Sequence, residues 1–353
     1  MMNTHKITLS LAMPLGHWSP HLKAALASVA KTNAQSKHGQ IALSILDASQ
    51  DGRVCADIKT STITPAYIRT GLDGGQTAAI SEGWNNVPGD IVGWLNGDDA
   101  LIFGALDVVF KHFQDNPDTD VVYGQSVISD EHGRIIGLHP EVVPASSLLL
   151  RSNIISQPSC FVRREALDSV GGLNDRLEYT MDWDFWVRLY RSGKSFHYID
   201  QVLSNVVWDF NTKTSKFNWQ RIKELNNVIR RNNNLYFHTK SLFGFFQHYW
   251  ATYKKPIRQN LPISSLKTPI NQYLALPILN LTAMPQNCLS LNLLKTSPKS
   301  LIRLLIGGHA EQLSNSRNCI KLSPPIAPGD YVLLEFDNPT KGEVYFKDAL
   351  WGQ

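Results

Sequence analysis

Cysteine is scarce in this sequence, and the few cysteines present are scattered. They lie at Cys55, Cys160, Cys288 and Cys319, with no Cys-x-x-Cys spacing among them. Neither a zinc site nor a disulfide framework is therefore indicated, and reduced, mostly buried thiols are expected.

Long apolar runs are missing as well. No stretch reaches the roughly 18 apolar residues needed to span a bilayer. The first twenty residues contain one lysine and a short apolar run that Pro14 interrupts, which is not a signal-peptide core followed by a cleavage site. We therefore expect a cytoplasmic protein, which could also work at the inner face of the membrane.

The chain also lacks a strong charge bias. Its net charge is +4 at pH 7 and its pI is about 8.7, which is too weakly basic to indicate binding to nucleic acid. With 43% hydrophobic and 18% charged residues, the composition suits an ordered globular protein. A length of 353 residues predicts more than one domain.

Strand-like and helix-like segments alternate over the first 120 residues. Strands are expected at 6–13, 40–49, 90–96 and 120–127, and the first of them should end at Pro14. Ser19 followed by Pro20 is typical of a helix N-cap with proline in the first turn. This alternation predicts βαβ units and an α/β fold with a largely parallel sheet covered on both faces.

The rest of the chain changes character twice. Residues 216–231 predict a basic amphipathic helix, and the final 70 residues alternate short apolar strands with Pro, Gly and Asn. We therefore divide the chain into an α/β domain (1–215), a helical connector (216–275) and a small β-sandwich (276–353).

Residues 235–258 are dense in aromatics and end in lysine and arginine. Two interpretations are open. The segment could rest on an anionic membrane surface, or it could be an ordinary helix that packs its aromatics between the domains, which we favour because few charges precede Lys254.

The stretch GDIVGWLNGDD ends a predicted buried strand in two adjacent acids, Asp98 and Asp99. Ligands of open α/β sheets bind outside the carboxyl ends of the strands. Paired carboxylates there can hold Mg²⁺ or Mn²⁺ against a diphosphate. The alternative is that Asn-Gly forms a tight turn and the aspartates cap the next helix.

A third acid, Asp182, opens a predicted helix after a glycine-containing loop. A carboxylate at this position could deprotonate an attacking hydroxyl group. Its alternative role is that of a helix N-cap, worth about 1 kcal/mol.

Several short stretches of the first 205 residues occur in one characteristic order. ILDASQDG (45–52) is similar to an Asp-Gly-Ser-Thr-Asp turn, and LDGGQTAAISEGW (72–84) is similar to Asp-x-Gly-Gln-x-x-Ala-x-Asn-x-Gly. GDIVGWLNGDD follows, and then IISQPSCFVRREAL (154–167) and VGGLNDRLEYTMDWDFWVRL (170–189). In this order the chain resembles the inverting nucleotide-sugar glycosyltransferases of family 2, which have the Rossmann-like GT-A fold, and particularly the bacterial members that build surface polysaccharides.

This resemblance implies roles on the donor side. Asp47 corresponds to the aspartate that holds the base or ribose, and Asp73 and Gln76 to the segment that helps bind the nucleotide. Asp98 and Asp99 correspond to the acids that contact ribose and a metal-bound diphosphate, with Asp99 the first choice as metal ligand.

It also implies roles on the acceptor side. Asp182 corresponds to the general base, and Gln157 and the backbone of Gly171 and Gly172 would line the sugar and acceptor site. Trp183 could stack on a sugar, although an aromatic residue at helical spacing is more often in the core, and we favour the core.

The implied activity is transfer of a sugar from a nucleotide-diphosphate sugar to a hydroxyl of a glycan or lipid-linked acceptor, with inversion and with a divalent metal, Mn²⁺ or Mg²⁺. A UDP-sugar is the first choice of donor, before a GDP- or dTDP-sugar. No nucleic-acid partner is expected, and peripheral membrane association would suit a lipid-linked acceptor.

The sequence departs from the family pattern at several positions. Asn96 replaces the first acid of the metal motif, Met181 the frequent glutamate before the base, and Ser81 an asparagine. No Arg-x-His follows the last strand, so Lys213 or Lys216 could contact the diphosphate instead.

Two other functions stay open on the sequence alone. A sugar nucleotidyltransferase also uses an α/β sheet and metal-binding acids, but it should show a glycine-rich phosphate loop with a basic residue after the first strand, and AMPLGHWSP has neither. A non-catalytic carbohydrate-binding or scaffold protein would fit the β-rich C-terminal part and the departures at Asn96 and Met181.

Overall fold

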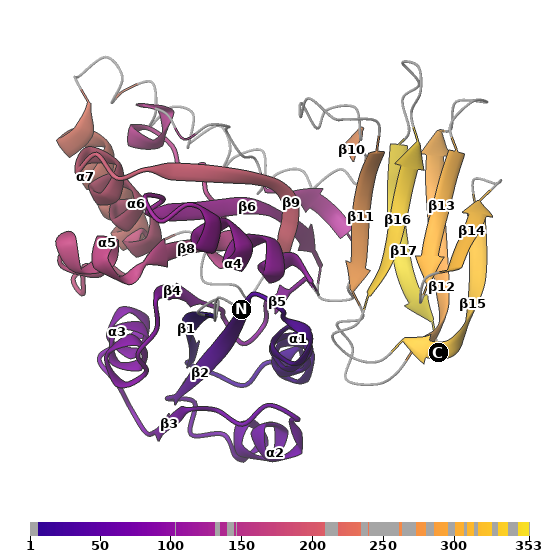
Figure 1. Ribbon diagram of the computed structural model, residues 1–353, viewed down its shortest axis with the longest axis horizontal. Coiled ribbons are helices and arrows are strands. Elements are labelled where there is room, and N and C mark those ends of the chain that lie inside the picture. The colour runs from indigo at the N-terminus through magenta and orange to yellow at the C-terminus, as the bar shows by residue number, and fades with distance from the viewer. Residues whose placement is uncertain are drawn as a thin grey trace, which may run out of the picture.

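The computed structural model describes residues 6–102, 104–130, 135–139, 145, 147–208, 218–233 and 239, and the C-terminal strands given below. The strands of the N-terminal domain (Figure 1) are β1 (Ile7–Leu15), β2 (Gly39–Asp47), β3 (Tyr67–Thr70), β4 (Ile91–Trp94), β5 (Ala100–Leu101), β6 (Val121–Ser129), β7 (Ile135–Leu138), β8 (Cys160–Arg163) and β9 (Phe196–Val207). The helices are α1 (Leu22–Gln35), α2 (Gly52–Thr60), α3 (Gln76–Asn86), α4 (Ala105–Asp115), α5 (Arg164–Ser169), α6 (Met181–Arg191) and α7 (Trp219–Asn232), with the 3-10 turns η1 (Ser147–Leu150) and η2 (Gln157–Ser159).

These strands form one nine-stranded sheet in the order β3-β2-β1-β4-β8-β6-β9-β5, with β7 paired to β6. The first four strands are parallel, as predicted. Beyond β4 the sheet is mixed: β6 and β9 are parallel, but the prediction of a largely parallel sheet is wrong for β8, which runs antiparallel to both β4 and β6. The described residues between β6 and β8 form two 3-10 turns and no α-helix, so that connection supplies no helical crossover of the kind a parallel return needs.

Helices cover both faces of the sheet, and each face has its own apolar core. In β1, the side chains of Leu9, Leu11 and Met13 belong to the core that also contains α1 and α4. Ala12, between them, belongs to the core that contains α3, α5 and α6. This alternation follows from the period of two in a strand and explains why strands buried on both faces read as continuous apolar runs.

Two predicted boundaries moved by a few residues. β1 continues through Pro14 to Leu15, because its pairing with β4 ends at Ala12 and no ladder partner on that side requires the missing N–H. The first helix begins at Leu22 rather than directly after Ser19. The hydroxyl of Ser19 accepts from the N–H of His21 at 3.1 Å, so Ser19 closes the turn that precedes the helix.

The C-terminal part consists of antiparallel strands, drawn in orange and yellow in Figure 1. They are β10 (Leu261–Pro262), β11 (Tyr273–Leu279), β12 (Gln286–Lys295), β13 (Leu301–Ile306), β14 (His309–Leu313), β15 (Arg317–Ile326), β16 (Tyr331–Asp337) and β17 (Tyr345–Gly352). They form two four-stranded sheets, β10-β17-β12-β15 and β11-β16-β13-β14. Face-to-face packing of the two sheets, which a sandwich requires, stays a prediction.

The predicted helical connector is described only in part. α7 confirms the expected amphipathic helix, and its Val228 and Ile229 lie in the same core as α6. β10 and the start of β11 precede residue 276 and pair with later strands. The segment 235–258 lies outside the described residues apart from Thr239, and within the described part no helix has the length and hydrophobicity to cross a bilayer.

The contact of α3 with the sheet depends on Gly83. A Cβ atom added there would lie 2.9 Å from Cδ2 of Leu46 and closer still to Oγ of Ser44. We expect Gly83→Ala to be less stable than Gly52→Ala by about 1–3 kcal/mol, measured by urea denaturation. Gly52 is the control, because it is also a helical glycine and its added Cβ meets nothing within 4 Å. Equal urea midpoints for the two variants would show that α3 can move away from the sheet without loss of stability.

Candidate active site

The carboxyl ends of the four parallel strands lie at one edge of the sheet. Asp47, the last residue of β2, is in register with Leu15 of β1 and with Thr70 of β3. Trp94, the last residue of β4, is in register with Ala12. The loops that contain most of the predicted donor-side residues therefore begin at the same edge.

A chain of hydrogen bonds connects three segments at the end of β4. The side-chain amide of Gln76 donates to Oδ1 of Asn96 at 2.9 Å, and the amide of Asn96 donates to Oδ2 of Asp99 at 3.0 Å. The backbone N–H of Val207, at the end of β9, donates to Oδ1 of Asp99 at 3.1 Å. Asn96, which departs from the family pattern, is thus the central link between α3 and the acid.

The carboxylate of Asp99 is only 3% exposed. Burial raises its pKa well above the usual range, and the negative charge of neighbouring Asp98 raises it further, against the hydrogen bonds from Val207 and Asn96. Asp98 itself is partly exposed. Two adjacent carboxylates that repel each other are a donor set that a divalent cation stabilises.

The fit of a metal to this pair can be judged from its donor atoms. Among the described residues there is no group of three or more His, Cys, Asp or Glu side chains that could hold a metal ion. Mg²⁺ commonly takes one or two carboxylates and completes its shell with substrate phosphates and water. Asp98 and Asp99 fit such a shared site, and each oxygen of Asp99 keeps a lone pair beyond the hydrogen bond it accepts.

Asp47 and Asp73 hold the loops at the neighbouring strand ends. Oδ1 of Asp47 accepts from both the N–H and the hydroxyl of Ser49, at 2.9 and 2.5 Å. Asp73 accepts from Arg69 at 2.9 Å and from the N–H of Gly75 at 2.8 Å. Both residues lie where the sequence predicts a nucleotide site, and their contact with a nucleotide stays a prediction.

Asp182 lies in the first turn of α6, partly exposed. Burial raises the pKa of its carboxyl, while the N–H of Trp183 and the side-chain amide of Asn153 oppose that rise. The bond from Asn153 to Oδ2 is 2.9 Å long. The alternative that Asp182 is the N-cap is wrong, because Thr180 occupies that position.

Asp182 and the end of β4 are linked through η2 and the start of β8. The charge of Asp182 adds to burial in raising the pKa of the Cys160 thiol. Cys160 follows η2, where the amide of Gln157 donates to the backbone oxygen of Trp94 at 2.5 Å. The same short segment therefore contacts the last residue of β4 and feels the charge of the predicted base.

Other predicted acceptor-side residues have structural roles. Gly171 and Gly172 have φ of 75° and 73°, and their N–H groups donate to Asp168 and Leu167 in a Schellman motif that ends α5. Trp183 is 1% exposed and its indole N–H donates to the backbone oxygen of Leu149 at 2.7 Å, so the structure favours the core over a sugar platform.

Asn153 and Glu224 are site residues that the sequence did not reveal. Oδ1 of Asn153 is buried and has no hydrogen-bond partner among the residues that the structure describes, although Nδ2 of the same side chain holds Asp182. Such an orphaned acceptor beside a candidate base is a place for a ligand hydroxyl. Its sequence neighbourhood, Arg-Ser-Asn, carries no signal for this role, and Lys213 and Lys216 lie outside the described residues.

Glu224 of α7 caps the start of α6 from a distance. Thr180 makes no side-chain capping bond of its own. Instead, the carboxylate of Glu224, 5% exposed, accepts from the N–H groups of Glu178, Tyr179 and Thr180 at 3.1, 2.8 and 3.1 Å. The only sign of this role in the sequence was the position of Glu224, four residues before Val228 on the buried face of an amphipathic helix.

Comparison with known proteins gives a family match. A family model described as "Glycosyl transferase family 2" matches residues 20–171. An uncharacterized glycosyltransferase of Rickettsia conorii is 25% identical over 214 residues, 57% of this chain and 34% of the relative. One of Methanocaldococcus jannaschii is 23% identical over 141 residues, 39% of this chain and 48% of the relative. The chain thus matches about a third to a half of the length of these curated relatives.

Solved structures share the fold only distantly. S. aureus TarS 1-349, in complex with UDP-GlcNAc, is 14% identical with a TM-score of 0.49 and covers 70% of this chain and 73% of that one. The mannosyltransferase PcManGT from Pyrobaculum calidifontis, in complex with GDP-Man and Mn²⁺, is 12% identical with a TM-score of 0.42, over 71% and 82%. Because both TM-scores are below 0.5, neither likeness bears on the substrate of this chain.

Replacement of Glu224 tests the cap on α6. In Glu224→Gln one of the two oxygens becomes an amide donor, which faces either the N–H of Glu178 or those of Tyr179 and Thr180, so we expect a loss of about 1–3 kcal/mol in the free energy of unfolding. Amide hydrogens of residues 178–182 should also exchange faster. Glu165→Gln is the control, because Glu165 is an exposed glutamate on α5. Unchanged exchange in Glu224→Gln would mean that α6 starts stably without this carboxylate.

Proposed function

From the premise that its N-terminal domain belongs to glycosyltransferase family 2, we propose that this chain transfers a sugar from a nucleotide-diphosphate sugar to a hydroxyl of a glycan or lipid-linked acceptor, with inversion. One observation carries the proposal. Asp99, buried and held by hydrogen bonds from Asn96 and Val207, follows β4 at the carboxyl edge of the parallel strands, where ligands of open α/β sheets bind.

On the donor side, Asp98 and Asp99 would hold the diphosphate through a shared divalent cation, Mn²⁺ or Mg²⁺. When bound, the cation supplies neutralisation of the charge that develops on the leaving nucleotide. Asn96 and the N–H of Val207 fix the orientation of the Asp99 carboxylate, and Gln76 fixes Asn96. These bonds hold the acid in place before the donor arrives.

The nucleoside would lie along the neighbouring strand ends. Asp47 and Asp73 stand at the ends of β2 and β3, and their carboxylates shape the two loops there. We propose a UDP-sugar as first choice of donor, before a GDP- or dTDP-sugar.

On the acceptor side, Asp182 would take the proton of the attacking hydroxyl. Its raised pKa makes it a better proton acceptor than an ordinary aspartate, provided that it is ionised at the working pH. Oδ1 of Asn153, which has no partner in the described part of the chain, is a buried acceptor that could orient the same hydroxyl. Attack from the side opposite the diphosphate gives inversion without a covalent intermediate. A lipid-linked acceptor would bring the protein to the inner face of the membrane.

Removal of Asp99 tests the donor site. We expect Asp99→Ala to abolish transfer and to remove the Mn²⁺-dependent part of nucleotide binding, because it deletes one of the two metal-binding carboxylates. A thermal-shift screen against UDP, GDP, dTDP and CMP, with and without Mn²⁺, measures binding, since a ligand of the native state raises its stability. Asp115→Ala is the control, because Asp115 is an exposed residue of α4 paired only with Lys111. Metal-dependent nucleotide binding at wild-type strength in Asp99→Ala would contradict the assignment of Asp99 as a metal ligand.

Replacement of Asp182 tests the base. Asp182→Asn should bind nucleotide normally and lose about 10²-fold or more in transfer, measured with radiolabelled nucleotide sugars. In the wild type, kcat should fall as pH drops through the raised pKa of Asp182, because only the ionised carboxylate accepts a proton. The midpoint of this fall in kcat should lie at a pH above the ordinary pKa range of aspartate. If Asp182→Asn keeps transfer within threefold, another group is the base.

A further inference from the structure

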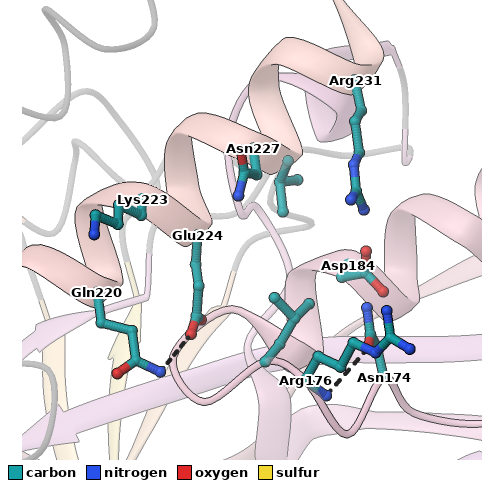
Figure 2. Close-up of a pocket in the computed structure, with 10 residues that line it drawn as sticks. Asn174, Arg176, Asp184, Gln220, Lys223, Glu224, Asn227 and Arg231 are labelled. Atoms are coloured by element: carbon teal, nitrogen blue, oxygen red, sulfur yellow. Dashed lines mark hydrogen bonds between the residues drawn. The ribbon is translucent and has the colours of Figure 1, made fainter.

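A pocket lies between α7 and the loop that leads into α6, away from the end of β4. Its volume is about 420 Å³, and it contains none of the residues assigned above to the donor or to the base. One wall is a stripe along α7 formed by Gln220, Lys223, Asn227 and Arg231, whose spacing of three or four residues places them on one helix face (Figure 2). The opposite wall includes Arg176.

The acidic groups of this pocket are already engaged. Asp184 of α6 accepts from Nε of Arg188 at 2.8 Å. Glu224 accepts from the three backbone N–H groups that precede α6, and from the amide of Gln220 at 3.2 Å. Their negative charges are therefore largely balanced by groups of the protein itself.

The basic groups are not engaged. The charged groups of Arg176, Lys223 and Arg231 form no ion pair or hydrogen bond with any part of the chain that the structure describes. Only the backbone N–H of Arg176 is bonded, to Oδ1 of Asn174 at 3.2 Å. Figure 2 shows the side chain of Arg231 reaching from α7 towards Asp184, with Arg176 on the far side. Three positive charges around one concave site repel each other, and an anion bound among them would relieve that repulsion.

The kind of anion follows from the donors. Guanidinium groups match the geometry of phosphate oxygens, and a phosphate monoester carries close to two charges at neutral pH. Asn227 and Gln220 add neutral amides to the same wall. A volume of about 420 Å³ is more than one phosphate fills and lies in the range of small-molecule sites. We propose that this pocket binds the phosphate group of a phosphorylated ligand.

The pocket is separate from the catalytic residues. Asp184 lines it, whereas Asp182 lies two residues earlier, about 200° away around the helix, and bonds Asn153. A phosphate here does not compete with the nucleotide. The phosphate can belong to the acceptor, and this interpretation rests on the proposed function. It can also belong to a small free ligand, and that interpretation does not depend on the proposed function.

Two probes distinguish these sources. Inorganic phosphate represents the small ligand, and a water-soluble prenyl diphosphate represents a lipid-linked acceptor. Binding of each is measured by isothermal titration calorimetry with and without saturating UDP, and without Mn²⁺, which would itself bind both probes. We expect phosphate to bind with Kd in the millimolar range, and we expect UDP not to displace it.

The variant Arg176→Gln/Arg231→Gln removes both guanidinium groups and should weaken binding of either probe by about 10-fold or more. Arg230→Gln is the matched control, because Arg230 is the exposed neighbour of Arg231 on α7 and does not line the pocket. All of these arginines are exposed, and circular dichroism checks that the variants fold.

The outcomes separate clearly. Prenyl diphosphate binding that is lost in the double variant supports an acceptor phosphate. If inorganic phosphate binds and prenyl diphosphate does not, the pocket takes a small phosphorylated ligand. Affinity equal in the wild type and the double variant, or no binding of either probe at about 10 mM, overturns the site. Because binding is measured without sugar transfer, failure of the proposed activity leaves this result unaffected, and the reverse also holds.

Discussion

The carboxylate of Asp99 is buried between the two halves of the sheet, and its hydrogen bonds join them. One bond comes from Asn96, which follows β4 in the parallel half, and the other from the N–H of Val207 at the end of β9 in the mixed half. A buried carboxylate without such partners would be costly, so the position of β9 and the 95–99 loop depend on each other. The edge at which the donor-side residues gather is defined by this bond pair.

The parallel half of the fold was predictable, because its signals are local. Leu9, Leu11 and Met13 alternate with small residues in one strand, and the acids follow directly after another. The direction of β8 was not predictable, since it depends on which strands accept it as a neighbour. Sequence periodicity describes the faces of a segment and not the partner that covers them.

The same limit applies to the site. Asp98, Asp99 and Asp182 could be identified because acids at strand ends and helix starts have chemical meaning at their own positions. The partners that orient Asp182 could not, because Asn153 and Glu224 come from segments 29 and 42 residues away from it in the chain. Trp183 shows the reverse case. Its helical spacing favoured a buried ring, and its 1% exposure and its bond to the backbone oxygen of Leu149 agree with that.

Asn96 also affects the thermodynamics of binding. Its amide accepts from Gln76 and donates to Asp99, so a flip of the amide would set donor against donor and acceptor against acceptor. A carboxylate at this position would instead meet Asp99 with a like charge and would need a cation to order the loop. With the amide, the loop is preorganised without a cation, and less conformational entropy has to be lost when a ligand binds. A ligand that binds at this edge of the sheet therefore meets a loop whose order does not depend on a cation.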